Sequence, residues 1–195
     1  MADPSLTVLV IDESPARAAI LEDGLREAGH VSVVRLETTH ELLRRVFEID
    51  PDVILIDLAS PSRDVLEQMF QVSRMVKRPV AMFVDQSDTA SIEASVDAGV
   101  SAYIVDGLKK ERVKAILDMT VSRFNAFDHL QKELDRARSE LAERKTIERA
   151  KGILMKSKGI GEDEAYALMR RTAMNEKMKL ADVARSVVTA AQLLI

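Results

Sequence analysis

Residues 7–14 read TVLVIDES, a short apolar run that ends in two acids and a serine. A continuous apolar run of this length, closed by polar residues, is typical of a strand buried on both faces of a sheet. DVILID at 52–57 repeats the pattern. Three further apolar runs lie at 31–36, 79–84 and 101–105. The segments after the first four runs have helical spacing, at 15–28, 40–49, 64–76 and 89–99. Five strands alternating with helices predict an α/β fold with a parallel, doubly wound sheet.

The composition of the 195-residue chain excludes several classes of protein. Hydrophobic residues make up 47% and the net charge is −4, which is typical of a globular protein. The chain has no cysteine, so disulfides, thiolate metal sites and cysteine nucleophiles are impossible. Its three scattered histidines do not suit a zinc site. No apolar run reaches about 18 residues and no secretion signal begins the chain, so we expect a cytoplasmic protein without a membrane span.

Acidic residues stand where the expected strands end. Asp12 and Glu13 follow the first strand, and Asp57 closes the third. The carboxyl ends of parallel strands meet at one edge of the sheet, where ligands bind. Repulsion among three carboxylates is best relieved by a hard cation such as Mg²⁺, and a carboxylate there can accept a phosphoryl group. The alternative is that Asp12 and Asp57 are only helix caps or turn residues.

Further residues of the same segment extend this pattern. They are Asp57 with Pro61 and Asp64, Pro79 before the fourth strand, and Ala98-Gly99 with Tyr103 on the fifth strand. With the acids at the strand ends, they make residues 5–122 resemble the receiver domain of two-component response regulators. The resemblance implies that Asp57 is the would-be phosphoacceptor and that Asp12 and Glu13 are the would-be metal ligands. We expect that the protein requires no cofactor, although the acidic pocket is chemically suited to Mg²⁺.

Two positions depart from the receiver pattern. Receivers normally carry Thr or Ser at the end of the fourth strand and Lys-Pro after the fifth, whereas this chain has Val84 and Asp106-Gly107. The hydroxyl and the ammonium that would hold the phosphoryl oxygens are therefore missing, and Asp106 adds negative charge to the pocket. We infer that this receiver does not signal by phosphorylation and serves as a docking platform.

A long segment without proline, from Lys110 to about Lys158, is rich in residues that favour helix. Apolar residues within it are spaced 3, 4, 3 and 4 apart, at Phe127, Leu130, Leu134, Ala137 and Leu141. This spacing is typical of a coiled-coil seam. We expect the seam to join two copies of the chain in a homodimer. The alternative is an intramolecular hairpin with the last helices.

The end of the chain is expected to form a small helical unit. Gly159 suits the end of the long helix, and two more helices are expected at 162–174 and 180–194. Residues 145–180 contain nine basic and five acidic residues, a net charge of +4, while the rest of the chain carries −8. This asymmetry is typical of a phosphate-backbone binder joined to an acidic regulator, and the alternative is an ordinary solvated face.

The motifs of this unit are IERAKGILM (147–155), Glu164-Ala165-Tyr166, Arg170-Arg171 and Asp182-Val183-Ala184. With them, the unit resembles the ANTAR domain, which implies RNA binding and transcription antitermination. The domain order resembles receiver–ANTAR antiterminators, above all the NasT-like, nitrate- or nitrite-responsive branch related to AmiR. The expected parts are a receiver domain at 1–122, a helical coiled-coil linker at 123–134 and a three-helix ANTAR domain at 135–195. The resemblance implies two partners, namely paired hairpins in leader mRNA and a controlling nitrate/nitrite sensor protein of the NasS type.

The candidates for RNA contact are Arg149, Lys151, Gly152, Lys156, Lys158, Tyr166, Arg170, Arg171 and Lys177. Tyr166 and the two adjacent arginines offer a stacking surface and forked donors for unpaired bases, and the lysines hold phosphates. Gly152 allows close approach of another backbone. The alternatives are core packing for Tyr166, helix–helix contact for Gly152 and a surface ion pair for Arg149.

Other classes of function stay open on the sequence alone. One is a phosphorylation-dependent response regulator with a DNA-binding output, which the absence of a clear recognition-helix pattern disfavours. Another is a protein–protein scaffold built on the coiled-coil seam. An enzyme is disfavoured because no nucleophile–base pair or phosphate-cradling loop appears outside the acidic pocket.

Overall fold

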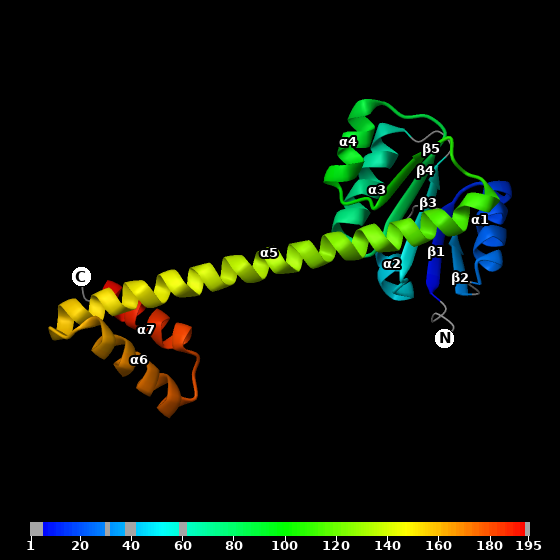
Figure 1. Ribbon diagram of the computed structural model, residues 1–195. Coiled ribbons are helices and arrows are strands. Elements are labelled where there is room, and N and C mark those ends of the chain that lie inside the picture. The colour runs from blue at the N-terminus through cyan, green and yellow to red at the C-terminus, as the bar shows by residue number, and fades with distance from the viewer. Residues whose placement is uncertain (1–5, 30–31, 38–41, 59–61, 194–195) are drawn as a thin grey trace. The chain divides into compact units, whose positions relative to one another are not determined.

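The computed structural model describes residues 6–29, 32–37, 42–58 and 62–193. His30, His40 and Pro61 lie outside these ranges. The chain divides into two compact units, residues 1–128 and 129–195. The first unit holds a sheet with helices around it, and the second is helical (Figure 1).

The first unit is built on a sheet of five parallel strands. They are β1 (Thr7–Asp12), β2 (Ser32–Leu36), β3 (Val53–Leu58), β4 (Val80–Val84) and β5 (Ala102–Val105), in the spatial order β2-β1-β3-β4-β5. Every residue of β3 is buried, as its continuous apolar run predicts. The strand order reverses between β1 and β3, and parallel sheets commonly bind ligands at the carboxyl ends of strands that flank such a reversal.

Helices cover both faces of this sheet (Figure 1). They are α1 (Pro15–Glu27), α2 (Leu42–Ile49), α3 (Arg63–Val76), α4 (Thr89–Asp97) and the first part of α5 (Lys110–Lys158). Because successive strand residues point to opposite faces, Leu9 and Ile11 pack with α2, α3 and α4, whereas Val8 and Val10 pack with α1 and α5. A Cβ added at Gly24 would lie 2.7 Å from the Val113 side chain, so α1 and α5 approach each other closely.

Local side-chain caps explain where two of these helices begin. The Ser62 hydroxyl accepts a hydrogen bond from the Val65 N–H (3.3 Å) at the start of α3. The Asp88 carboxylate accepts one from the Ser91 N–H (2.7 Å) at the start of α4. Each cap satisfies a donor that the first helical turn leaves without a backbone partner.

The second unit consists of the last part of α5 with α6 (Glu162–Glu176) and α7 (Leu180–Leu193). Gly159 ends α5 with a φ of +65°, as expected. The core is made largely of small and unbranched side chains: Ala150, Leu154, Ala165, Met169, Ala173, Val183 and Ala184. The predicted fold class, a parallel α/β unit followed by a long helix and a small helical unit, is confirmed. Among the described helices, none is both long and apolar enough to cross a membrane.

Candidate functional site

Two of the predicted acids meet at the edge of the sheet. Asp12 and Asp57 are direct neighbours in the β1–β3 register, and each is only 2% exposed. Asp12 Oδ1 accepts a hydrogen bond from the Ser14 N–H (2.7 Å), whereas Asp12 Oδ2 is buried without a partner. Glu13, in contrast, is exposed. The pocket therefore contains two buried carboxylates at the place that the sequence predicts.

An arginine from α1 closes this pocket. Arg17 donates to both carboxylate oxygens of Asp57, from Nε to Oδ2 (2.8 Å) and from a terminal nitrogen to Oδ1 (2.7 Å). Its other terminal nitrogen donates to Asp85 Oδ1 (2.8 Å). The Asp57 side chain is fully buried and the Arg17 side chain is 24% exposed. We call this group of Arg17, Asp57 and Asp85 the arginine clamp.

The clamp and its surroundings raise the pKa values of Arg17 and Asp12. The hydrogen bond to Asp57 raises the pKa of Arg17 above its already high ordinary value, with a further contribution from Asp85. Burial raises the pKa of Asp12, the hydrogen bond from Ser14 opposes the rise, and the charge of Asp57 adds to it. The guanidinium thus stays charged, and Asp12 is a carboxylate held in an environment that disfavours its ionised form.

Arg17 and Asp85 were missed by the sequence reasoning. A signal for Arg17 was present, because a residue in the first turn of the helix after β1 lies beside the strand ends. A signal for Asp85 was present as well, since it directly follows β4. Arginine has no role in the expected phosphoryl chemistry, and Asp85 lies one residue after the position where the receiver pattern expects a hydroxyl, so neither residue is among the predicted site residues.

The two atypical positions lie together at the ends of β4 and β5. Val84 is the last residue of β4 and is buried, and its carbonyl accepts a hydrogen bond from the Asp106 N–H (2.9 Å). Asp106 is exposed and has a left-handed φ of +48°, a conformation that Asp tolerates better than most residues. The nearby hydroxyls of Ser87 and Tyr103 are 3.0 Å apart. Position 84 thus lacks a hydroxyl, and the next hydroxyl along the chain, that of Ser87, lies against the hydroxyl of Tyr103.

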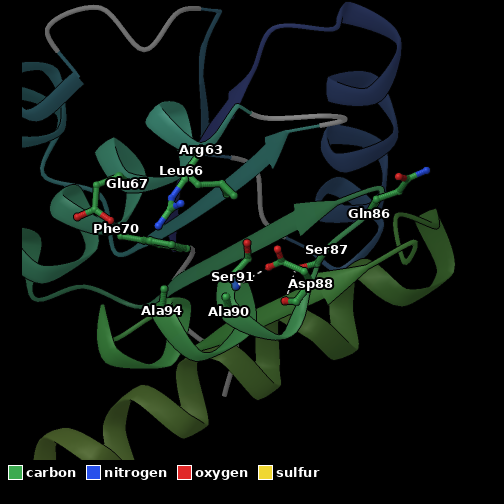
Figure 2. A pocket seen from close by; sticks show the side chains of 10 residues that line it. All are labelled: Arg63, Leu66, Glu67, Phe70, Gln86, Ser87, Asp88, Ala90, Ser91 and Ala94. Atoms are coloured by element: carbon green, nitrogen blue, oxygen red, sulfur yellow. Dashed lines mark hydrogen bonds between the residues drawn. The ribbon is translucent and has the colours of Figure 1, made fainter.

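A cleft of about 470 Å³ lies between α3 and α4 and is bordered by the segment that follows Asp85 of the clamp. Its walls carry both polar and apolar side chains: Arg63, Leu66, Glu67, Phe70, Gln86, Ser87, Asp88, Ala90, Ser91 and Ala94 (Figure 2). Gln86, Ser87 and Asp88 directly follow Asp85, so the clamp holds one end of the segment that forms this rim.

Six exposed basic residues of the second unit form no ion pairs among the described residues. We call Arg149, Lys156, Lys158, Arg170, Arg171 and Lys177 the cationic surface. All six residues are exposed, and none of them forms an ion pair within the described part of the chain. The alternative of a surface ion pair for Arg149 is therefore not what the structure shows. Unpaired exposed cations remain available to an external polyanion.

Lys151 differs from the other predicted RNA contacts. Its side chain is only 11% exposed, and its ammonium lies 2.8 Å from Glu148 Oε1 and 2.6 Å from Glu162 Oε1. These partners raise the pKa of Lys151, Glu148 most, and Lys151 in turn lowers the pKa of Glu162. Lys151 therefore joins α5 to the first turn of α6 within the unit.

Gly152 and Tyr166 both lie open to the outside. A Cβ added at Gly152 would meet nothing within 4 Å, so the glycine is not needed for a helix–helix contact. Tyr166 is 42% exposed and is not a core residue. Tyr166, Arg170 and Met174 are four residues apart along α6 and share one face, whereas Arg171 lies about 100° further round the helix.

Comparisons with known proteins match one known domain to each of the two compact units of the chain. Residues 8–118 match the response regulator receiver domain, and residues 135–188 match the ANTAR domain. The chain belongs to the response regulator receiver family. An ANTAR domain behind a receiver domain is the arrangement of RNA-binding antitermination regulators, which are not enzymes, and in this general sense the chain is one.

Individual relatives match most or part of the chain. Transcriptional regulatory protein PdtaR of Mycobacterium tuberculosis is 27% identical over 186 residues, which cover 95% of this chain and 90% of the relative. The nitrate regulatory protein of Klebsiella oxytoca is 30% identical over 76 residues, which cover 39% of this chain and 19% of the relative. A response regulator from Thermotoga maritima has a similar structure (TM-score 0.54, 20% identity, 61% of this chain and 99% of that chain), which shows the receiver fold.

Receiver domains commonly bind Mg²⁺ in this acidic pocket, but the side chains of this receiver domain do not suit the ion as they lie. Both oxygens of Asp57 accept hydrogen bonds from Arg17, and Glu13 is exposed. Of the carboxylate oxygens of Asp12 and Asp57, only Asp12 Oδ2 lacks a partner. The described residues contain no group of three or more His, Asp or Glu placed to hold a metal ion. The assignment of Mg²⁺ to Asp12, Glu13 and Asp57 stays a prediction.

The predicted seam lies uncovered on α5. Its members are exposed, namely Phe127 (66%), Leu130 (64%), Leu134 (44%), Leu141 (54%) and Ala137. Within the second unit, α6 and α7 pack on Ala150 and Leu154 instead. An intramolecular hairpin that covers the seam of this unit is therefore not formed.

Proposed function

We propose that this protein binds paired hairpins in leader transcripts of nitrate or nitrite assimilation genes and prevents a terminator stem from forming. A sensor partner protein controls when it does so. The observation that carries this proposal is the cationic surface, which is exposed and unpaired beside an exposed tyrosine in a domain of the ANTAR type.

The geometry of α6 suits recognition of a hairpin loop. Proteins read RNA sequence mainly from unpaired bases, which stack on planar side chains and form hydrogen bonds at their edges. Tyr166 and Arg170 share one exposed face of α6 and offer a ring and a forked donor side by side. Lys156 and Lys158 at the end of α5 then hold phosphates, and the open backbone at Gly152 allows the RNA to come close.

A dimer of the chain would offer one ANTAR domain to each of two hairpins. The exposed seam residues recur with coiled-coil spacing on α5, and their burial against a second copy removes apolar surface from water. In such a dimer each ANTAR domain holds one hairpin. The second binding event then takes place at a high effective concentration, so paired hairpins bind more tightly than single ones.

The nitrate assignment is supported by one relative's function and by the resemblance to NasT-like proteins. The relative is the nitrate regulatory protein of Klebsiella oxytoca, which matches 39% of this chain. A receiver domain whose phosphoacceptor is held by Arg17 suits control by a bound protein of the NasS type rather than by phosphoryl transfer.

A gel-shift titration of the full-length protein tests the proposal. The probes are a leader RNA with two hairpins, the same RNA with one hairpin, and duplex DNA of equal length. We expect the two-hairpin RNA to bind most tightly. Tyr166→Ala with Arg170→Ala should abolish this preference, whereas the control Arg185→Ala, an exposed arginine outside the cationic surface, should keep it. Tighter binding to duplex DNA would instead favour a DNA-binding response regulator.

A further inference from the structure

The arginine clamp occupies the atoms on which a phosphoacceptor depends. An aspartate that accepts a phosphoryl group needs one free oxygen to attack phosphorus and a cation beside the other to offset the transferred charge. In this receiver domain both oxygens of Asp57 accept hydrogen bonds from Arg17, at 2.8 and 2.7 Å. The Asp57 side chain is fully buried, so no other face of the carboxylate is open to solvent.

The cation of the clamp is held on the chain itself. Arg17 is carried by α1, whose Leu21 and Leu25 are fully buried in the core, so the guanidinium is fixed beside Asp57. A tethered group competes with a free ion at a high effective concentration. The planar guanidinium also matches both oxygens of a carboxylate at once. A divalent ion must displace this bidentate pair before it can reach Asp57.

We propose that Arg17 is a built-in replacement for the divalent cation of the receiver domain. The clamp closes the pocket to Mg²⁺ and holds Asp57 and Asp85 in a single arrangement. Asp85 connects the clamp to the segment 86–88, which borders the cleft between α3 and α4 (Figure 2). The receiver domain is therefore held in one state by an internal ion pair, whatever the supply of Mg²⁺.

Mn²⁺ binding to the full-length protein tests this proposal, because electron paramagnetic resonance counts free Mn²⁺ directly. We expect Arg17→Ala to bind Mn²⁺ at least about tenfold more tightly than the wild type, since the competing buried pair is gone. Adding Asp57→Asn to Arg17→Ala should remove this gain. The matched control is Arg26→Ala, which removes an exposed arginine from the same helix and should bind Mn²⁺ like the wild type. Equal affinity of the wild type and Arg17→Ala would overturn the proposal.

A second measurement serves if Arg17→Ala does not fold. The melting temperature of the wild type is compared with that of Asp57→Asn, each with and without about 10 mM Mg²⁺. The clamp predicts that Mg²⁺ shifts the two proteins equally, because Asp57 does not bind the ion in either. A stabilisation by Mg²⁺ that appears in the wild type and is lost in Asp57→Asn would contradict the proposal.

Discussion

Lys151 on α5 and Glu162 at the start of α6 form an ion pair of 2.6 Å that crosses the break between the two helices. The Lys151 side chain is only 11% exposed, and its ammonium also contacts Glu148. Lys151, which the sequence predicts to contact RNA, therefore helps to hold the ANTAR domain together. The lysines of the domain thus have two roles: Lys151 joins two helices, whereas exposed lysines such as Lys156 are available to bind RNA.

The salt dependence of RNA binding should distinguish Lys151 from Lys156. Each phosphate contact that is lost lowers the slope of log affinity against log salt by about 0.7–0.9. We expect Lys156→Met to reduce the slope by about this amount, because its ammonium is exposed and unpaired. Lys151→Met should leave the slope unchanged while it lowers the stability of the domain. A slope that falls equally in both variants would show that Lys151 binds phosphate after all.

The stability of the ANTAR domain should depend on pH through the same pair. The pKa of Glu162 is lowered by Lys151, so its contribution is present above the ordinary glutamate value of about 4.3 and is lost as the pH falls through the lower folded value. We expect the wild type to lose more stability than Glu162→Gln between about pH 5 and pH 3.

Tyrosine fluorescence can measure this loss in the full-length chain, which has two tyrosines and no tryptophan. In a Tyr103→Phe background, Tyr166 on α6 is the only tyrosine and reports on the ANTAR domain alone. Parallel acid unfolding curves for the wild type and Glu162→Gln would mean that the ion pair contributes nothing to stability.

Gly152→Ala should separate helix stability from RNA contact. The new methyl group meets nothing within 4 Å, and alanine favours a helix over glycine by about 0.5–1 kcal/mol. We expect the variant to be more stable and to bind hairpin RNA several-fold more weakly, because the methyl group fills the space that the RNA backbone needs. Chemical denaturation and gel shifts on one preparation measure both. Unchanged affinity in the stabilised variant would remove Gly152 from the RNA interface.

The two arginines of α6 should contribute unequally. Arg170 lies on the same face as Tyr166, whereas Arg171 points about 100° away. We expect Arg170→Ala to weaken recognition of the hairpin loop by about 1–3 kcal/mol. Arg171→Ala should weaken binding less and to a similar extent for any RNA sequence. Titrations with the native loop and with a scrambled loop test this, and equal losses of loop preference in both variants would argue against the shared face.

Asp57 should resist labelling by small phosphodonors. With Arg17 on both carboxylate oxygens and no hydroxyl at Val84, the phosphoryl group has neither a free acceptor nor a donor to hold it. We expect no stoichiometric labelling of the wild type with Mg²⁺ and acetyl phosphate, as judged by intact-protein mass spectrometry. Full labelling of Asp57 that changes RNA affinity would restore phosphorylation as the switch.

Much of this architecture follows from local patterns. Apolar runs such as 52–57 identify buried strands, and Gly159 marks the end of α5, because burial and backbone conformation constrain these positions directly. Contacts between distant residues do not follow in the same way. Arg17 meets Asp57 across 40 positions, and Lys151 turns away from solvent toward Glu162, because tertiary packing brings these groups together. A list of basic residues cannot show which of them are already paired.

Single-round transcription through a leader terminator tests the central claim most directly. The template carries two hairpins ahead of the terminator, and the protein is added at concentrations that saturate the RNA. The account predicts that readthrough rises with the wild type and does not rise with Tyr166→Ala plus Arg170→Ala. Readthrough that stays at its starting level while the RNA is fully bound, or that rises equally on a leader without hairpins, would contradict it.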